Sequence, residues 1–67
     1  MVLKQKEMKE ALEDYLILNA YTPSSSYKIN DELQMDANNE FGSMKCFRIT
    51  PKGEIKVFKH AKWSTIN

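Results

Sequence analysis

Cysteine and glycine are scarce in this chain of 67 residues, and long apolar runs are missing. Cys46 is the only cysteine, and the chain has two glycines and two prolines. One cysteine cannot form an intramolecular disulfide, which is typical of a reducing compartment, so we expect a cytoplasmic protein. The first residues lack the apolar segment of a signal peptide. No apolar run approaches the roughly 20 residues of a membrane span, so we expect no membrane partner.

The short length limits what the chain can bury. We expect one domain, residues 1–67, and a domain this small buries only about 60% of the surface of its unfolded chain. A thin core leaves little room for a deep substrate cavity, which argues against a metabolic enzyme. A homodimer could supply the missing burial, with Met35, Phe58 and Trp63 as candidates for the dimer seam.

The residue types that carry enzyme chemistry are also few. One histidine and one cysteine give no zinc pattern, and two glycines give no phosphate-binding loop. Cys46 and His60 form the only nucleophile–base pair worth weighing, but a half-buried cysteine and a surface histidine are much more common. We therefore predict a protein that is not an enzyme and has no catalytic residues, no metal site and no cofactor.

An amphipathic helix is predicted over Leu3–Ala20, because apolar and small side chains recur there at helical spacing. The stripe comprises Met8, Ala11, Leu12, Tyr15, Leu16 and Asn19. Thr22 precedes Pro23 and is disfavoured in helical conformation, so we expect the helix to end by about Tyr21. The polar residues that follow, 22–26, are predicted to be a connector.

The middle of the chain has two interpretations. Tyr27–Ile29 is predicted to be a short strand. Asn30–Phe41 could be a helix capped by Asn30 and stopped by Gly42. The same residues could instead be a strand through Leu33 and Met35, a turn over residues 36–40 and a second strand from Phe41. The neighbouring asparagines 38 and 39 favour the turn.

Residues 44–63 are predicted to form one β-hairpin. Thr50-Pro51-Lys52-Gly53 fits a type I turn, with glycine in the left-handed position. This turn pairs Ile49 with Ile55 and Phe47 with Val57 on the face toward the helix. Arg48 then lies beside Lys56, Cys46 beside Phe58 and Met44 beside His60 on the other face. Lys45 and Lys59 fall opposite each other on the core side, at the end away from the turn, where their aliphatic chains can extend past the core to solvent.

Together these elements predict an α+β fold. An N-terminal amphipathic helix packs on a small antiparallel sheet of three to four strands, centred on the C-terminal hairpin. The predicted core comprises Leu12, Tyr15, Leu16, Phe47, Ile49, Ile55 and Val57.

Charge is distributed unevenly along the chain. Six cationic side chains lie in residues 44–63 against one acid, whereas residues 1–43 carry four lysines and eight acids. Cations interleaved with aromatic rings can follow a phosphate backbone while a ring stacks on a base, so we predict nucleic-acid binding. The candidate residues are Lys45, Arg48, Lys52, Lys56, Phe58, Lys59, Lys62 and Trp63. The alternative is that the lysines only solubilise an edge strand.

A second hypothesis is a phage-type or mobile-element regulator that inhibits a host protein by binding it. Its contact surface would be acidic, and the candidates are Glu7, Glu10, Glu13 and Asp14 on the helix, with Asp31, Glu32, Asp36 and Glu40.

Two weaker resemblances involve the hairpin. The segment FRITPKGE, residues 47–54, resembles the wing of winged-helix DNA-binding domains, which implies DNA contact by the hairpin. The resemblance covers about eight residues and supplies no recognition helix. A basic sheet beside a helix, with Arg48, Lys56 and His60, loosely resembles the small ribonuclease toxins of toxin–antitoxin systems, which implies phosphate binding by the cations and proton transfer by His60.

Overall fold

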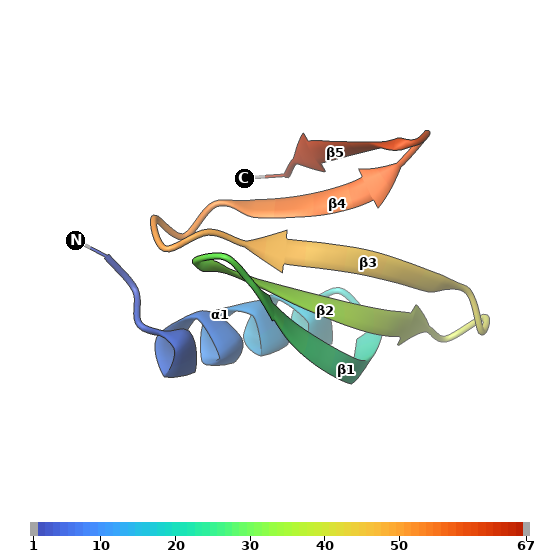
Figure 1. Cartoon of the computed structure of the whole chain (residues 1–67). Coiled ribbons are helices and arrows are strands. Elements are labelled where there is room, and N and C mark those ends of the chain that lie inside the picture. Colours follow the sequence, from blue (N-terminus) through green and yellow to red (C-terminus); the bar gives the residue numbers. More distant parts are fainter. Residues whose placement is uncertain (1, 67) are drawn as a thin grey trace.

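The computed structural model describes residues 2–66 and shows one helix packed on a five-stranded antiparallel sheet (Figure 1). The elements are α1 Gln5–Leu18, β1 Tyr21–Ile29, β2 Glu32–Asn39, β3 Met44–Ile49, β4 Ile55–Lys59 and β5 Lys62–Thr65. The strands are neighbours in chain order, so hairpins connect them all. The predicted α+β class is confirmed, with five strands rather than three to four. No helix within residues 2–66 is long and apolar enough to cross a membrane.

The helix forms where the apolar stripe predicted it. Lys4 precedes α1 in extended conformation, and its backbone N–H donates to Oε1 of Glu7 at 2.9 Å, which satisfies a free donor at the helix start. At the other end, the side chain of Asn19 donates to the carbonyl of Tyr15 at 2.8 Å. Ala20 then takes a positive φ of 64° and turns the chain into β1. The helix therefore ends before Tyr21, as predicted.

The polar residues 22–26 belong to β1, so the predicted connector is wrong. β1 is an edge strand of nine residues, and its register on β2 shifts between Pro23 and Ser25. A proline and a bulge are tolerated at a sheet edge, where one side of the strand needs no hydrogen-bond donors. Backbone pairing to β2 therefore makes this strand, although its side chains show no apolar alternation.

Residues 30–41 follow the strand interpretation, and the helix alternative is wrong. The turn comes later than predicted, at residues 40–43, so β2 continues through Asn39. Oδ1 of Asn39 accepts hydrogen bonds from the backbone N–H groups of Phe41 and Ser43, both at 2.9 Å. This side chain fixes the turn, and the longer strand carries Met35 and Ala37 into the core.

Residues 44–63 contain one complete hairpin and part of a second. The backbone N–H of Gly53 donates to the carbonyl of Thr50 at 2.9 Å, and Gly53 has φ +89°, as the predicted turn requires. The pairs Phe47–Val57, Arg48–Lys56 and Ile49–Ile55 are confirmed. Three predicted pairs lie outside the β3–β4 ladder, which ends at Phe47 and Val57: Cys46 with Phe58, Lys45 with Lys59 and Met44 with His60. His60 instead forms a turn with Ala61, because both have positive φ, and the chain returns as β5.

The sheet has an inner face toward α1 and an outer face away from it. Buried side chains on the inner face and the helix form the core, which comprises Met8, Leu12, Leu16, Leu33, Met35, Ala37, Phe47, Ile49, Ile55 and Val57. Tyr15 packs partly buried against it, so the predicted core residues are all present. Met35 is 1% exposed and cannot form a dimer seam, which corrects that expectation.

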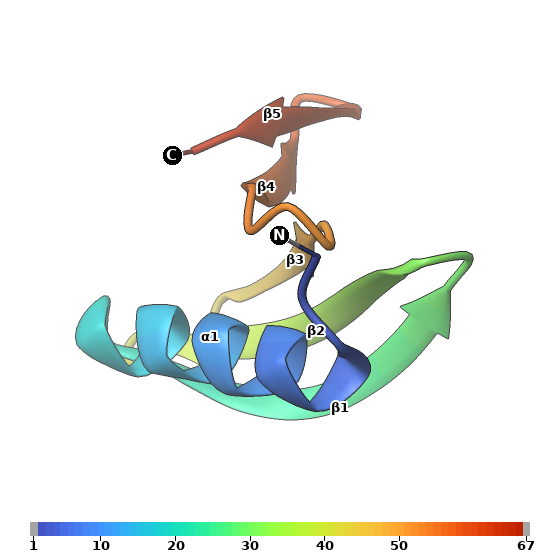
Figure 2. The same cartoon turned by 90° about the vertical axis from the view of Figure 1, so that its left-hand side faces the viewer.

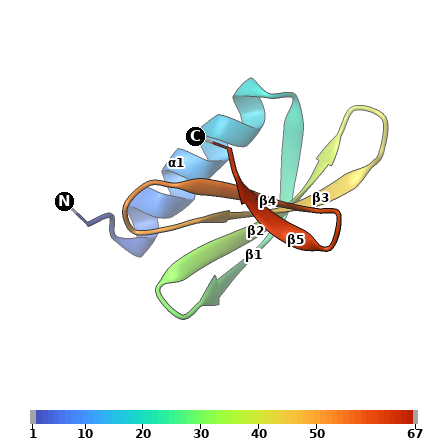
Figure 3. The ribbon, with the colours of Figure 1, turned by 90° about the horizontal axis from the view of Figure 1, so that it is seen from above.

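The helix covers only part of the inner face. It packs against β1, β2 and β3, while the β4–β5 hairpin rises away from it (Figure 2). From above, α1 and the β4–β5 hairpin run at an angle to one another (Figure 3). The inner face of β4 near the β5 turn is therefore left without a helix over it.

Candidate nucleic-acid interface

The eight residues predicted to bind nucleic acid do not form one surface. The structure divides them between two faces and one turn. Arg48, Lys56, Phe58 and Trp63 lie on the outer face, Lys45, Lys59 and Lys62 on the inner face, and Lys52 in the β3–β4 turn. The alternation of strand side chains separates them, because a hairpin points successive residues to opposite faces.

The aromatic residues of the outer face are engaged with one another and with Arg48. The guanidinium carbon of Arg48 lies 4.3 Å from the ring centroid of Trp63, a cation–π contact. The Trp63 and Phe58 rings are 5.2 Å apart, and Nε of Arg48 donates to Oε1 of Gln34 at 3.0 Å. Trp63 is half-buried on the sheet, whereas Phe58 stays 44% exposed, so this face keeps one largely open ring.

The remaining outer-face charges are balanced. Lys56 Nζ lies 3.5 Å from Oε2 of Glu32, an ion pair with both side chains about one quarter exposed. Asp36 lies opposite Cys46 in the β2–β3 ladder. The two cations of this face, Arg48 and Lys56, thus stand with two acids, and the outer face has no excess positive charge.

Cys46 has an environment that suppresses its reactivity. A hydrogen bond with the Asp36 side chain is the main cause that raises the pKa of the thiol, and burial and the Asp36 charge add to it against the opposing effect of Arg48. The thiol is therefore neutral at neutral pH, and thiolate is the nucleophilic form. Cys46 and His60 share no hydrogen bond within residues 2–66, since His60 lies in the β4–β5 turn.

We expect Cys46 to react with iodoacetamide several-fold more slowly than the same residue in the unfolded chain at mildly alkaline pH. Asp36→Ala should speed the reaction of the folded protein, because it removes the largest cause of the raised pKa. A pKa raised by folding stabilises the protein below the ordinary thiol pKa of 9.0, and this contribution is lost as pH rises through the folded-state value. An alkylation rate that Asp36→Ala leaves unchanged would contradict this assignment.

The inner face carries a groove where α1 stops covering the sheet. The groove has a volume of about 290 Å³. We call it the lysine groove, and its lining residues are Tyr15, Asn19, Tyr21, Lys45, Phe47, Val57, Lys59 and Ile66. Among residues 2–66, two lysines and no acidic side chain line this groove.

Three lysines gather beside this groove on three neighbouring strands. Lys59 and Lys62 are direct cross-strand partners in the β4–β5 ladder. Lys45 precedes Phe47 by two residues on β3, and Lys59 follows Val57 by two residues on β4. Because strand side chains alternate, both lysines lie on the inner face with Phe47 and Val57. All three are exposed, and none has an ion-pair partner among residues 2–66. Like charges directly opposite cost on the order of 0.2–1 kcal/mol, and no acid within residues 2–66 forms an ion pair that offsets this cost.

Two tyrosines form the aromatic wall of the lysine groove. Tyr15 and Tyr21 both pack edge-on against Phe47, with ring centroids 6.3 and 5.1 Å away. Neither hydroxyl has a hydrogen-bond partner among residues 2–66, so both remain available to a ligand. The sequence predicted Tyr15 only as core and gave Tyr21 no role, because their convergence depends on how the helix crosses the sheet.

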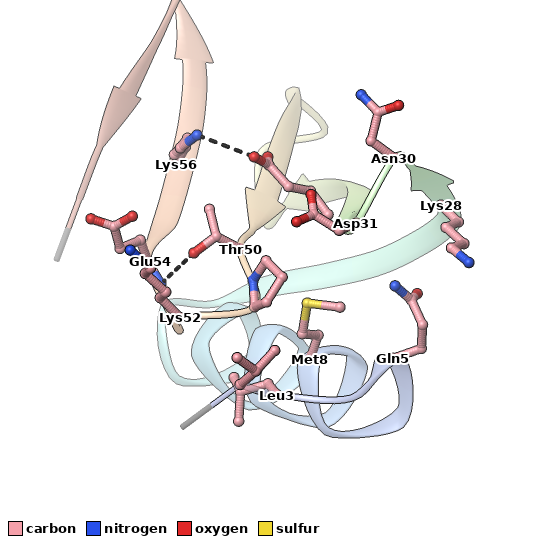
Figure 4. A pocket seen from close by; sticks show the side chains of 13 residues that line it. Leu3, Gln5, Met8, Lys28, Asn30, Asp31, Thr50, Lys52, Glu54 and Lys56 are labelled. Atoms are coloured by element: carbon pink, nitrogen blue, oxygen red, sulfur yellow. Dashed lines mark hydrogen bonds and ion pairs between the residues drawn. The ribbon is translucent and has the colours of Figure 1, made fainter.

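A larger cavity at the other end of the molecule has a different character. It measures about 670 Å³ and lies between the start of α1 and the β1–β2 and β3–β4 turns (Figure 4). Leu3 and Met8 line its apolar part. Its charged side chains are Lys28, Lys52 and Lys56 with Asp31, Glu32 and Glu54. Within residues 2–66 the cationic and acidic side chains that line this cavity are equal in number, so they give no preference for phosphate. Lys52 lies apart from the lysine groove.

The acids predicted for a protein partner are also divided. Glu7 is engaged at the helix start, and Glu10 and Asp14 are exposed. Glu13 is half-buried and lines a separate hollow with Lys9 and β1 residues. No group of three or more potential ligands for a metal ion occurs within residues 2–66. Comparison of the chain with protein-family models, curated proteins and solved structures finds no match.

Proposed function

We propose that this protein is a small non-enzymatic nucleic-acid-binding accessory protein whose contact surface is the lysine groove with Lys62. The observation that supports it is that Lys45, Lys59 and Lys62 gather on one face and that none of them forms an ion pair with an acid in the part of the chain that the structure describes. This surface is narrower than the eight residues predicted from the sequence. It omits the outer-face pair Arg48 and Trp63, which are already in contact with each other.

The destabilisation caused by the lysine cluster indicates that the cluster has a function. The direct Lys59–Lys62 pair breaks the rule that opposite charges face each other across strands. Natural sequences break such local rules mainly at functional sites. A phosphate backbone would supply the missing negative charge, and the hydroxyls of Tyr15 and Tyr21 would add donors within the groove.

Salt dependence tests this proposal. We expect the affinity for a mixed-sequence single-stranded oligonucleotide to fall with salt, with a log–log slope of about −2, because three lysines each release about 0.7 counterion. Lys45→Gln combined with Lys59→Gln should reduce the slope to about −0.7. Fluorescence anisotropy across a salt series measures both values.

The matched control changes two exposed lysines elsewhere. Lys6→Gln combined with Lys9→Gln removes the same number of positive charges, but from α1, and leaves the lysine groove intact. Its slope should equal that of the unmodified protein. The proposal fails if no oligonucleotide binds at low salt, or if both double variants change the slope by the same amount.

A second candidate is a regulator that binds a host protein. Large apolar side chains at exposed positions favour it, since Leu18 is 85% and Phe41 84% exposed. Affinity capture from host lysate, with and without nuclease, distinguishes the two. A stoichiometric protein that survives nuclease and is lost with Glu10→Lys and Asp14→Lys would support this candidate, whereas material lost with nuclease would count against it.

A further inference from the structure

The lysine groove is concave, and this shape bears on which form of nucleic acid it accepts. Resting on the proposed function, we propose that the groove holds one unstacked base of a single strand while Lys45 and Lys59 contact the flanking phosphates. Its volume of about 290 Å³ lies at the lower limit of small-ligand pockets, roughly 300 Å³. A site of this size accommodates a single ring system rather than a helix.

The side chains that line the lysine groove are of the types that bind a nucleic-acid base. Phe47 and Val57 lie at the floor of the groove and are almost fully buried, so its open apolar surface comes from Ile66, which is 41% exposed, and from the half-buried Tyr15 and Tyr21. Tyr15 and Tyr21 present rings to one side and hydroxyls without partners. Any base can stack its flat face on an aromatic ring, and polar groups beside the ring can form hydrogen bonds with the edge of the base.

The arrangement of the cations completes the site. Lys45 and Lys59 line the same groove from β3 and β4, beyond Phe47 and Val57, the last paired residues of that ladder. Both are exposed, so their ammonium groups reach solvent while the apolar floor lies below. A strand whose base enters the groove thus brings its phosphates toward the two charges.

Duplexes do not satisfy this geometry. Bases of a duplex are read by an element that protrudes into a groove, such as a helix or a two-stranded ribbon. A hollow beside α1 cannot reach bases that remain stacked and paired. Bases of single strands can be splayed out and held against aromatic side chains, so the groove favours single strands.

Three probes of equal length test the inference on the unmodified protein: a single-stranded oligonucleotide, the same strand with abasic sites, and its duplex. One stacked base contributes about 5- to 150-fold in affinity, so the abasic strand should bind that much more weakly. The duplex should also bind more weakly than the single strand.

A tyrosine pair provides the matched variants. Tyr21→Leu keeps an apolar contact with Phe47 but removes the ring and hydroxyl, and should weaken binding of the normal strand without affecting the abasic strand. Tyr27→Leu changes a tyrosine that is 48% exposed on the outer face and should leave both unchanged.

The outcomes separate the two proposals. No binding of any probe would overturn the proposed function. Equal affinity for the normal and abasic strands would leave nucleic-acid binding standing and overturn base insertion. Duplex binding as tight as single-strand binding would also overturn it. The probe comparison uses the unmodified protein, so it decides even if Tyr21→Leu fails to fold.

Discussion

Leu12→Ala is expected to lower the free energy of unfolding by about 3–5 kcal/mol, because it removes a fully buried side chain from the centre of the core. Leu12 is 0% exposed and lies on the buried stripe of α1 between Met8 and Leu16. The total stability of a 67-residue domain is roughly 3–10 kcal/mol. Loss of one side chain should therefore remove about a third or more of the total stability.

Urea denaturation followed by far-ultraviolet circular dichroism measures this loss. Leu18→Ala is the matched control, since it makes the same chemical change at the last residue of α1, where the side chain is 85% exposed. Its effect should stay within about 0.5 kcal/mol. Similar losses from the two variants would mean that the helix does not pack on the sheet as described.

The second large effect concerns the lysine groove. Lys45→Glu combined with Lys59→Glu is expected to weaken oligonucleotide binding by about 1000-fold at about 0.1 M salt. Each reversal removes an attraction of about 1 kcal/mol and adds a similar repulsion, so two reversals amount to roughly 4 kcal/mol. Both side chains are exposed, so the fold should survive.

A control with the same net charge separates a local surface from general electrostatics. Lys28→Glu combined with Lys52→Glu changes two exposed lysines at the 670 Å³ cavity. We expect its affinity to fall less than 10-fold, because screening weakens the effect of charges beyond a Debye length of about 10 Å. Equal losses from the two double variants would show that only net charge matters.

The elements with strong local signals were predictable. The apolar stripe of α1 and the turn at Thr50–Gly53 specify their conformations from side-chain spacing and from one glycine with φ +89°. The β3–β4 register followed from that turn, because turn geometry fixes which residues pair. The face occupied by Lys45 and Lys59 was correct for the same reason.

The strands at the two edges gave no such signal. β1 contains three consecutive serines, and its pairing to β2 comes from the backbone. β5 follows a turn made by His60 and Ala61, whose positive φ values are those that glycine or asparagine usually supply. Without these residues the sequence pattern gives no sign of the second hairpin. The predicted β3–β4 pairing was therefore wrongly continued to Cys46 with Phe58 and Met44 with His60.

The candidate site was only partly predictable. Its cations could be found from charge, but sequence could not show that Arg48 is engaged with Trp63 or that Tyr21 approaches Phe47. These contacts join residues from different elements, and they depend on sheet twist and on the angle at which the helix crosses. Local patterns carry little information about either.

A paired measurement on Lys59→Glu tests most directly whether the lysine groove is kept for binding. The substitution turns the like-charge pair with Lys62 into an opposite-charge pair. We expect the free energy of unfolding to rise by about 0.2–1 kcal/mol and oligonucleotide affinity to fall by about 30-fold in the same protein sample. A variant whose oligonucleotide affinity is unchanged would contradict the account, whatever its stability.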